Sequence, residues 1–276
     1  MNERENNRRV VPMDEEERRR YMARRKAAMR KRKIKRNIRI ALIVVLSITL
    51  VAAILILKKY GPSKEPYDMN AYFGIQAENQ IGVTINNEVM EVPGIIEDGQ
   101  VYLSYETIRD YLNSRFYWDS NENILLYTLP RAMVRVEIGS EDYTVSREKK
   151  SEDYVILKTE GSTAYIALDF VQQHTNLEYA VFEEPGRVAI TSKFGKVTTA
   201  VLKRDTEIRY SGGVKSPVLK SASKGDKVIV VEEADSWRKV RTEDGIVGYL
   251  KKSRLKSVKK EKTSREFQQE EFTNIS

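Results

Sequence analysis

The hydrophobic and polar residues follow two contrasting patterns along the chain. Residues 40–57 are eighteen consecutive uncharged positions, IALIVVLSITLVAAILIL, in which only Ser47 and Thr49 are polar. At about 1.5 Å of rise per residue, a helix over this run would be roughly 27 Å long, close to the ~30 Å hydrocarbon core of a bilayer. The run therefore predicts one N-terminal transmembrane α-helix.

A cleaved secretory signal is the main alternative for this run, because it also places an apolar stretch after a basic one. Three features favour an uncleaved anchor. The run exceeds the usual length of roughly 7–15 residues for such a stretch, its basic flank is long, and it leads into Lys58-Lys59-Tyr60 instead of a small-residue cleavage site. A buried helix of a soluble protein fits less well, since the run has almost no polar face.

After residue 57 the apolar residues come in short β-branched and aromatic runs separated by Gly, Asp, Asn and Ser, which is typical of β-sheet domains. We expect strands over 82–85, 88–92, 100–104, 116–119 and 124–128, with turns at Asn86-Asn87 and Asp98-Gly99. Residues 105–113 have the apolar spacing of one short amphipathic helix. The order of strands, helix and strands predicts an α+β module.

The same pattern then recurs. Residues 101–128 align without a gap on residues 164–191, so that Tyr102 corresponds to Tyr165 and Asn113 to Asn176. We therefore expect two tandem α+β modules, over 80–130 and 131–195. The matched positions are mostly apolar or turn residues, so they indicate a structural repeat and say little about chemistry.

The basic residues are concentrated before the apolar run. Residues 1–39 contain 16 Lys or Arg and 6 Asp or Glu, net +10, whereas residues 40–276 contain 32 and 34, net −2. Because basic flanks remain in the cytoplasm, we expect a cytoplasmic tail over 1–39 and residues 58–276 outside the cell membrane. The tail and the apolar run would contact membrane lipid. Nucleic acid is not an expected partner, since the exterior part is nearly neutral and has no basic stripe.

The segment 58–79 contains Gly61-Pro62-Ser63-Lys64-Glu65-Pro66 and predicts a stalk or linker.

The chain has no cysteine, so its exterior part cannot use disulfides and must be stabilised by apolar cores. This composition also excludes a cysteine nucleophile and cysteine metal ligands.

The repeated segment resembles a known bacterial module. The motifs VTIN at 83–86, IEDGQVYL at 96–103 and FYWD at 116–119 are similar to those of copper amine oxidase N-terminal-like modules of cell-surface proteins. Where that family favours Val-Pro after the glycine, this chain has Leu103-Ser104. We expect no copper or other metal site, because His174 is the one histidine and ends a helix-like stretch where a structural role is favoured.

Residues 196–258 have a different pattern of short alternating strands and Gly-containing turns, which predicts an all-β, small closed barrel. The motifs that carry a resemblance to the bacterial SH3-like domain are TEIRYSGG at 206–213, KGDKVIVV at 224–231, SWRKVR at 236–241 and DGIVGYL at 244–250. Such domains in secreted bacterial proteins bind cell-wall peptides or position a neighbouring hydrolase. The resemblance implies a ligand groove, which we expect to involve the following residues: Arg209, Tyr210, Trp237 and Tyr249. Core packing is a strong alternative, because Trp237 begins a strand and can pack in the core, and Tyr249 can fill the barrel.

No catalytic constellation is visible in the sequence. The acidic pairs Glu183-Glu184 and Glu232-Glu233 lie in turn-like or strand-end contexts, and no hydrolase, metalloprotease or nucleotide-binding motif occurs. We expect no cofactor, and whether the protein belongs to an enzyme stays open. The polar segment 259–276 predicts a linker cut short before a further domain.

The order of anchor, paired modules, SH3-like barrel and polar linker resembles the N-terminal half of membrane-anchored family 18 glycoside hydrolases from Gram-positive anaerobes. We therefore expect a single-pass, cell-wall-facing stalk and binding region that is not itself catalytic. It would recognise cell-wall peptidoglycan or polysaccharide, or position a neighbouring domain. The alternative is the targeting portion of a cell-envelope hydrolase whose catalytic barrel lies beyond Ser276. A signalling protein is a third class, less favoured because no kinase, receiver or DNA-binding pattern precedes the anchor.

Overall fold

The computed structural model of the protein describes residues 14–263. The start of the basic tail and most of the expected C-terminal linker therefore lie outside the described residues. The chain divides at Gly61 into two compact units, residues 1–61 and residues 62–276.

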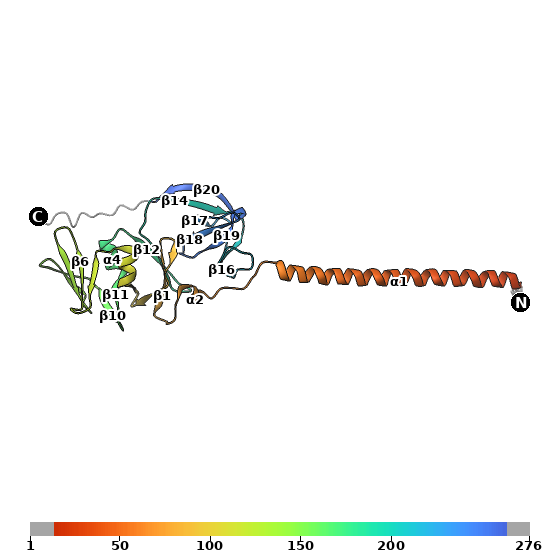
Figure 1. The fold of residues 1–276 in the computed structure, drawn as a ribbon, viewed down its shortest axis with the longest axis horizontal. Helices are drawn as coiled ribbons and strands as arrows, with labels where there is room; N and C mark the ends of the chain where they lie inside the picture. Colours follow the sequence, from red (N-terminus) through yellow and green to blue (C-terminus); the bar gives the residue numbers. More distant parts are fainter. Residues whose placement is uncertain (1–13, 264–276) are drawn as a thin grey trace, which may run out of the picture. The chain divides into compact units, whose positions relative to one another are not determined.

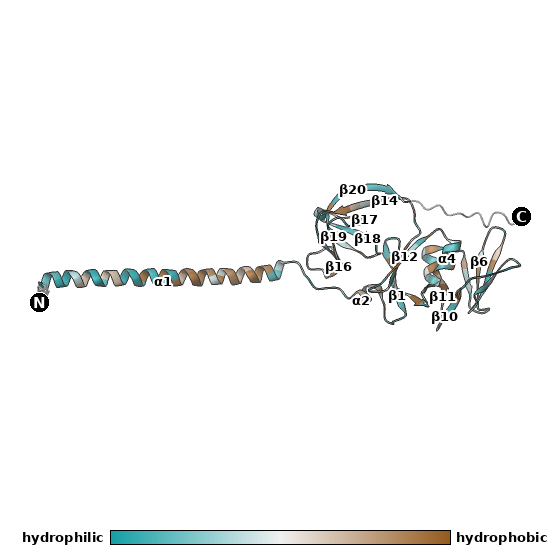
Figure 2. Cartoon of the chain, turned by 180° about the vertical axis from the view of Figure 1, so that it is seen from behind, coloured by the Kyte–Doolittle hydropathy of each residue, from teal (hydrophilic) through white to brown (hydrophobic). Residues whose placement is uncertain are grey.

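The first unit is one continuous helix, α1 (Glu15–Tyr60), which contains both the basic segment and the apolar run. Its N-terminal half is hydrophilic and its C-terminal half is hydrophobic (Figure 2). Acidic side chains occupy the first turn and Lys58 and Lys59 the last, an arrangement that complements the helix dipole. The helix is long and apolar enough to cross a membrane, a test that a signal sequence also passes.

The second unit contains three β-sheets and short helices (Figure 1). The helical elements are α2 (Met69–Phe73), α3 (Tyr105–Thr107), the π-turn η1 (Ile108–Leu112), α4 (Leu168–His174) and the 3-10 turn η2 (Lys252–Arg254). The eight-stranded sheet runs in the order β10 (Leu157–Glu160), β11 (Thr163–Ala167), β4 (Gln100–Ser104), β3 (Gly94–Glu97), β1 (Gln80–Ile85), β13 (Arg187–Thr191) and β12 (Glu178–Phe182), with β2 (Glu88–Val89) also paired to β1.

The five-stranded sheet runs in the order β5 (Phe116–Asp119), β6 (Ile124–Thr128), β7 (Met133–Glu137), β8 (Asp142–Val145) and β9 (Glu148–Ser151). The seven-stranded sheet runs in the order β16 (Val218–Ala222), β15 (Thr206–Arg209), β19 (Val247–Lys251), β18 (Trp237–Thr242), β17 (Lys227–Glu233), β14 (Lys196–Leu202) and β20 (Leu255–Lys262).

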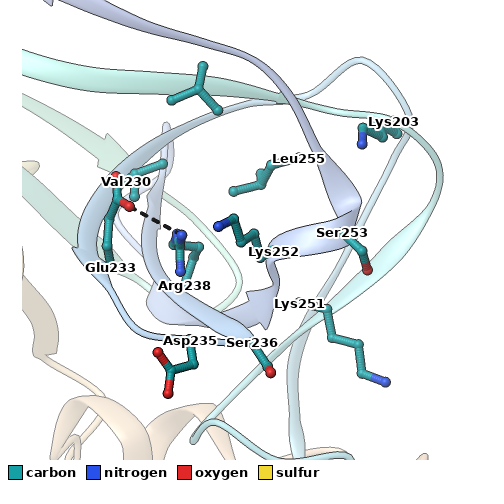
Figure 3. Close-up of a pocket in the computed structure, with 11 residues that line it drawn as sticks. Lys203, Val230, Glu233, Asp235, Ser236, Arg238, Lys251, Lys252, Ser253 and Leu255 are labelled. Carbon is teal, nitrogen blue, oxygen red and sulfur yellow. Dashed lines mark hydrogen bonds and ion pairs between the residues drawn. The ribbon is translucent and has the colours of Figure 1, made fainter.

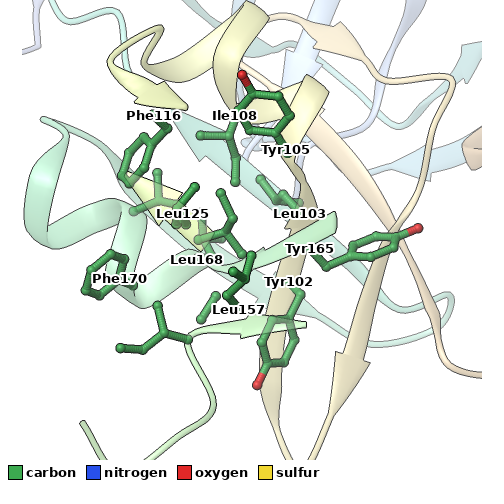
Figure 4. Packing of buried hydrophobic residues seen from close by; sticks show 14 of the residues in the cluster. Tyr102, Leu103, Tyr105, Ile108, Phe116, Leu125, Leu157, Tyr165, Leu168 and Phe170 are labelled. Atoms are coloured by element: carbon green, nitrogen blue, oxygen red, sulfur yellow. The ribbon is translucent and has the colours of Figure 1, made fainter. Parts of the chain in front are cut away.

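The repeat seen in the sequence is present in the structure. Strands β3, β4 and β6 recur as β10, β11 and β13, each beginning 63 positions later, and the helical turns after β4 recur as α4. Strands β4 and β11 pair with each other, with Leu103 opposite its counterpart Ile166. The two copies therefore contribute to one sheet and one core (Figure 4).

The ends of the repeated region are also joined. Strand β1 pairs in parallel with β13, so that Gly82 lies opposite Arg187 and Ile85 opposite Ile190. The expected turns are present, with positive φ at Asn86, Asp98 and Gly99. Parallel pairing requires a long connection, which here is the repeated region between the two strands.

The seven-stranded sheet has its own apolar core, which includes Ile208, Val240 and Leu250. We expected a closed barrel, but within the described residues the ladder runs from β16 to β20 without closing. The free edge of β16 is occupied by the segment after the anchor. Val218 N–H donates to the Glu65 carbonyl at 2.8 Å, and Tyr67 N–H donates to the Val218 carbonyl at 2.8 Å.

Most of the expected linker at 58–79 is thus ordered against this sheet. Asp68 caps α2 by accepting from the backbone N–H groups of Asn70 and Ala71, and Phe73 at the end of α2 is fully buried. At the other end, β20 continues to Lys262, past the boundary expected at residue 258. All seven strands of this sheet therefore follow the repeat, and the segment before the repeat packs along the edge of β16.

Candidate functional site

The four residues that the SH3-like resemblance singles out lie on or beside strands β15, β18 and β19. Tyr249 is opposite Lys239 in the β18–β19 pair, and Trp237 is opposite Lys251. Residues directly opposite in an antiparallel pair share a face of the sheet. The alternate positions, which include Val240 and Leu250, form the apolar core, so Trp237 and Tyr249 lie on the outer face.

Trp237 and Tyr249 come together over Gly212. A Cβ atom at Gly212 would lie 3.4 Å from Trp237 Cγ and 3.7 Å from Tyr249 Cδ1. The Lys251 ammonium lies 6.0 Å from the centre of the Trp237 ring. Both rings are half-buried, so each offers one accessible aromatic surface beside a lysine. This arrangement suits a ligand with an apolar face and a carboxylate or hydroxyl edge.

Arg209 is held differently from the aromatic pair. Its backbone is opposite Tyr249, but its side chain is only 5% exposed. The guanidinium donates to the Ser216 carbonyl at 2.6 Å and forms an ion pair with Glu207. A ligand role for Arg209 stays a prediction; in the structure this side chain holds the loop between β15 and β16.

Tyr210 belongs to a second aromatic cluster. Its ring is 48% exposed and stacks on Tyr67, with 4.5 Å between centroids and 6° between planes. Tyr72 meets Tyr210 edge-on at 6.5 Å and donates its hydroxyl to the Val247 carbonyl at 2.5 Å. Tyr67 and Tyr72 were missed in the sequence because they lie in the expected linker. Only the pairing of that linker with β16 brings them to Tyr210.

A pocket of about 760 Å³ opens beside the turn between β17 and β18 (Figure 3). Its lining includes Lys203, Val230, Glu233, Asp235, Ser236, Arg238, Lys251, Lys252, Ser253, Leu255 and Val258. These residues come from separate segments, so no sequence motif marks the pocket. Arg238 is buried and donates to the Trp237 carbonyl at 3.1 Å and to Glu233 at 3.1 Å, which fixes the turn that forms one wall.

The seven-stranded and eight-stranded sheets are joined at the turn between β18 and β19. Asp244 in this turn accepts from Arg187 at 2.5 Å and from Lys220 at 2.5 Å. Burial opposes ionisation of Asp244, but the hydrogen bonds and positive charges around it, led by Lys220, lower its pKa below the ordinary value. Thr84 also donates to the Gly245 carbonyl at 2.9 Å. These buried polar contacts fix the two sheets against each other.

His174 lies in an aromatic core at the end of α4. Its ring stacks on Tyr127 with 4.7 Å between centroids and meets Phe170 edge-on at 4.7 Å. Burial, together with the charge of Lys150, lowers the His174 pKa to about 4. A copper centre does not fit this environment, because no second histidine exists and aromatic rings surround the imidazole. Among residues 14–263, no group of three or more His, Asp or Glu side chains could hold a metal ion.

Comparison with known proteins agrees with the fold of the repeated region. A family profile described as the copper amine oxidase N-terminal domain matches residues 83–190. No curated protein and no solved structure matches the chain. The profile begins in β1 and ends in β13, the two strands that pair in parallel, and it spans both copies of the repeat. Residues 83–190 are therefore similar to the copper amine oxidase N-terminal domain, and the helix before them makes a membrane-anchored stalk compatible with the architecture.

Proposed function

We propose that the protein is a single-pass, membrane-anchored stalk whose exterior unit binds peptidoglycan through the outer face of the seven-stranded sheet. The anchor is the apolar half of α1, and the basic half would keep the N-terminus in the cytoplasm. The profile match at residues 83–190 supports the stalk part of this proposal. The SH3-like character of the seven-stranded sheet rests on the order of its four sequence motifs.

The observation that carries the binding role is the pair of half-buried rings, Trp237 and Tyr249, which lie together over Gly212 between two lysines. Aromatic surfaces stack against the apolar faces of sugars and peptides, and the lysine ammonium groups pair with peptide carboxylates. In the strand pairing, Lys239 lies opposite Tyr249 and Lys251 lies opposite Trp237. A wall peptide lying across β18 and β19 would meet all four side chains.

The test is sedimentation of the soluble unit, residues 62–276, with purified peptidoglycan sacculi. We expect the unit to pellet with sacculi and to release neither reducing sugar nor muropeptide. A contact at the centre of an interface is worth about 2 kcal/mol, which corresponds to roughly 30-fold in affinity. Tyr249→Ala should therefore weaken pelleting by about that factor. Tyr117→Ala, which changes an exposed tyrosine on β5, is the matched control and should leave pelleting unchanged.

Thermal unfolding of both variants separates binding from packing. If Tyr249→Ala keeps the unfolding temperature and loses pelleting, the ring contacts the wall. If the folded wild-type unit remains in the supernatant with sacculi from several Gram-positive sources, peptidoglycan binding is rejected and the stalk is a spacer.

A second candidate is the targeting portion of a cell-envelope family 18 glycoside hydrolase. The observation that favours it is the sequence order of anchor, repeat, SH3-like motifs and polar linker. The coding sequence beyond Ser276 distinguishes the two: a following (β/α)8 barrel with paired carboxylates supports the hydrolase, and a stop codon directly after Ser276 rejects it.

A further inference from the structure

The charges of the exterior unit are strongly separated between its sheets. Residues 62–195, which form the eight- and five-stranded sheets, contain 11 Lys or Arg and 22 Asp or Glu, net −11. Residues 196–263, which form the seven-stranded sheet, contain 18 and 9, net +9. The net charge of the exterior part is close to zero because the acidic residues 62–195 offset the basic seven-stranded sheet. Such a field attracts anionic ligands over roughly the Debye length of about 8 Å at physiological salt.

Three of the lysines of the seven-stranded sheet line the pocket beside the β17–β18 turn. Lys203 comes from the end of β14, and Lys251 and Lys252 come from the junction of β19 and η2. Figure 3 shows Lys203 and Lys252 on two sides of Leu255, which together with Val230 supplies an apolar lining.

The acids in the pocket balance only part of this charge. Glu233 pairs with the buried Arg238, and the lining contains one other carboxylate, Asp235, against three lysines. Within the part of the chain that the structure describes, neither Lys203 nor Lys252 has a carboxylate within ion-pair distance. Lysine ammonium groups are compact charges that bind phosphate oxygens without needing the planar geometry of arginine.

Strand β20 extends the positive charge away from the pocket. It starts at Leu255, a pocket residue, and carries exposed lysines at Lys256, Lys259, Lys260 and Lys262. At about 3.4 Å per residue, the lysines from Lys256 to Lys262 span roughly 20 Å. A single small anion would use only the pocket, whereas a linear polyanion would also meet the strand.

We propose that this pocket binds a phosphate group of a soluble, linear phosphate-bearing polyanion, and that the polymer chain continues along β20. The pocket lysines, Lys203 and Lys252, contact the phosphate oxygens, and Leu255 with Val230 excludes water from one side. Lys251 lines this pocket and also lies beside the Trp237 ring, but Lys203 and Lys252 are not part of the Trp237–Tyr249 site, so the proposal does not depend on peptidoglycan binding.

The probe is inorganic polyphosphate, titrated into residues 62–276 at 150 mM salt with affinity measured by calorimetry. The double substitution Lys203→Ala/Lys252→Ala should weaken binding by about tenfold or more and make the affinity less dependent on salt, because two phosphate contacts are lost. The matched control is Lys224→Ala/Lys227→Ala, which removes the same charge at the opposite end of β17. The control should change affinity less than threefold.

Each outcome decides the proposal. A loss confined to the pocket pair supports it. An equal loss in the control pair shows diffuse attraction to the basic sheet and overturns the pocket. Absence of binding by the wild type overturns it as well, as does binding to vesicles containing phosphatidylglycerol without binding to polyphosphate, since the phosphates recognised would then be lipid headgroups. Polyphosphate contains no sugar or peptide, so failure of the sacculus test leaves this result unaffected.

Discussion

Arg187 Nη2 lies 2.5 Å from Asp244 Oδ2, and this ion pair joins β13 of the repeat to the β18–β19 turn of the seven-stranded sheet. The two side chains are only 7% and 15% exposed. Arg187 also donates to the Asp244 carbonyl at 2.8 Å and to the Glu183 carbonyl at 3.0 Å. This buried, multiply bonded pair fixes the geometry between the two sheets.

Removal of Asp244 tests this connection. Asp244→Ala leaves the buried Arg187 without its carboxylate, and breaking such a pair costs about 3–5 kcal/mol. We expect the free energy of unfolding of residues 62–276, measured by urea denaturation, to fall by that order. Glu243→Ala, at the exposed neighbouring position, should change it by less than about 0.5 kcal/mol. Equal effects of the two substitutions would show that the turn does not couple the sheets.

Alanine substitutions at Gly245 and Gly99 distinguish the cost of backbone strain from the cost of steric crowding. Both have positive φ, +81° and +80°. A Cβ at Gly245 would lie 2.8 Å from Ala189 Cβ, whereas nothing lies within 4 Å of one at Gly99. Gly99→Ala should cost about 1 kcal/mol from the backbone alone, and Gly245→Ala should cost roughly 1–3 kcal/mol more. Thermal unfolding measures both, and a Gly245→Ala variant as stable as Gly99→Ala would contradict the close contact between the sheets.

His174 makes the stability depend on pH. Its pKa is about 4 in the folded protein and about 6.5 when unfolded. Between these values only the unfolded state binds the proton, so stability is highest above pH 6.5 and falls as the pH drops toward 4, by roughly 3 kcal/mol in total. His174→Phe should remove this part of the dependence. The difference between wild-type and variant urea midpoints across pH 4–7 isolates it, and parallel pH profiles would contradict a buried neutral imidazole.

The membrane topology is testable because the chain has no native cysteine. Single substitutions Ala27→Cys and Ser223→Cys place one thiol in α1 and one on the exterior unit. A membrane-impermeant maleimide added to intact cells should label Ser223→Cys only, and Ala27→Cys should react after permeabilisation. Labelling of Ala27→Cys in intact cells would reverse the proposed orientation. Loss of the Ala27→Cys site from the mature chain would instead show a cleaved signal.

Much of the fold was determined by local sequence. The apolar run predicted the long helix because eighteen uncharged residues leave no polar face, and the strands at 100–104, 116–119 and 124–128 are present with those bounds. The repeat was also visible, because the two copies share their pattern of apolar positions. The motifs at 236–241 and 244–250 were expected to contain strands, and the structure has β18 and β19 there, whereas a ligand role for Trp237 and Tyr249 stays a prediction.

The tertiary structure decided what the repeat and the linker pair with. Leu103 faces Ile166, and β1 joins β13, because long-range pairing depends on which edges remain free after the local hairpins form. The segment before α2 occupies the edge of β16 for the same reason, which brings Tyr67 to Tyr210. The ion pair of Asp244 with Arg187 and the lysine-lined pocket arise from residues distant in sequence, so no local pattern could have predicted them.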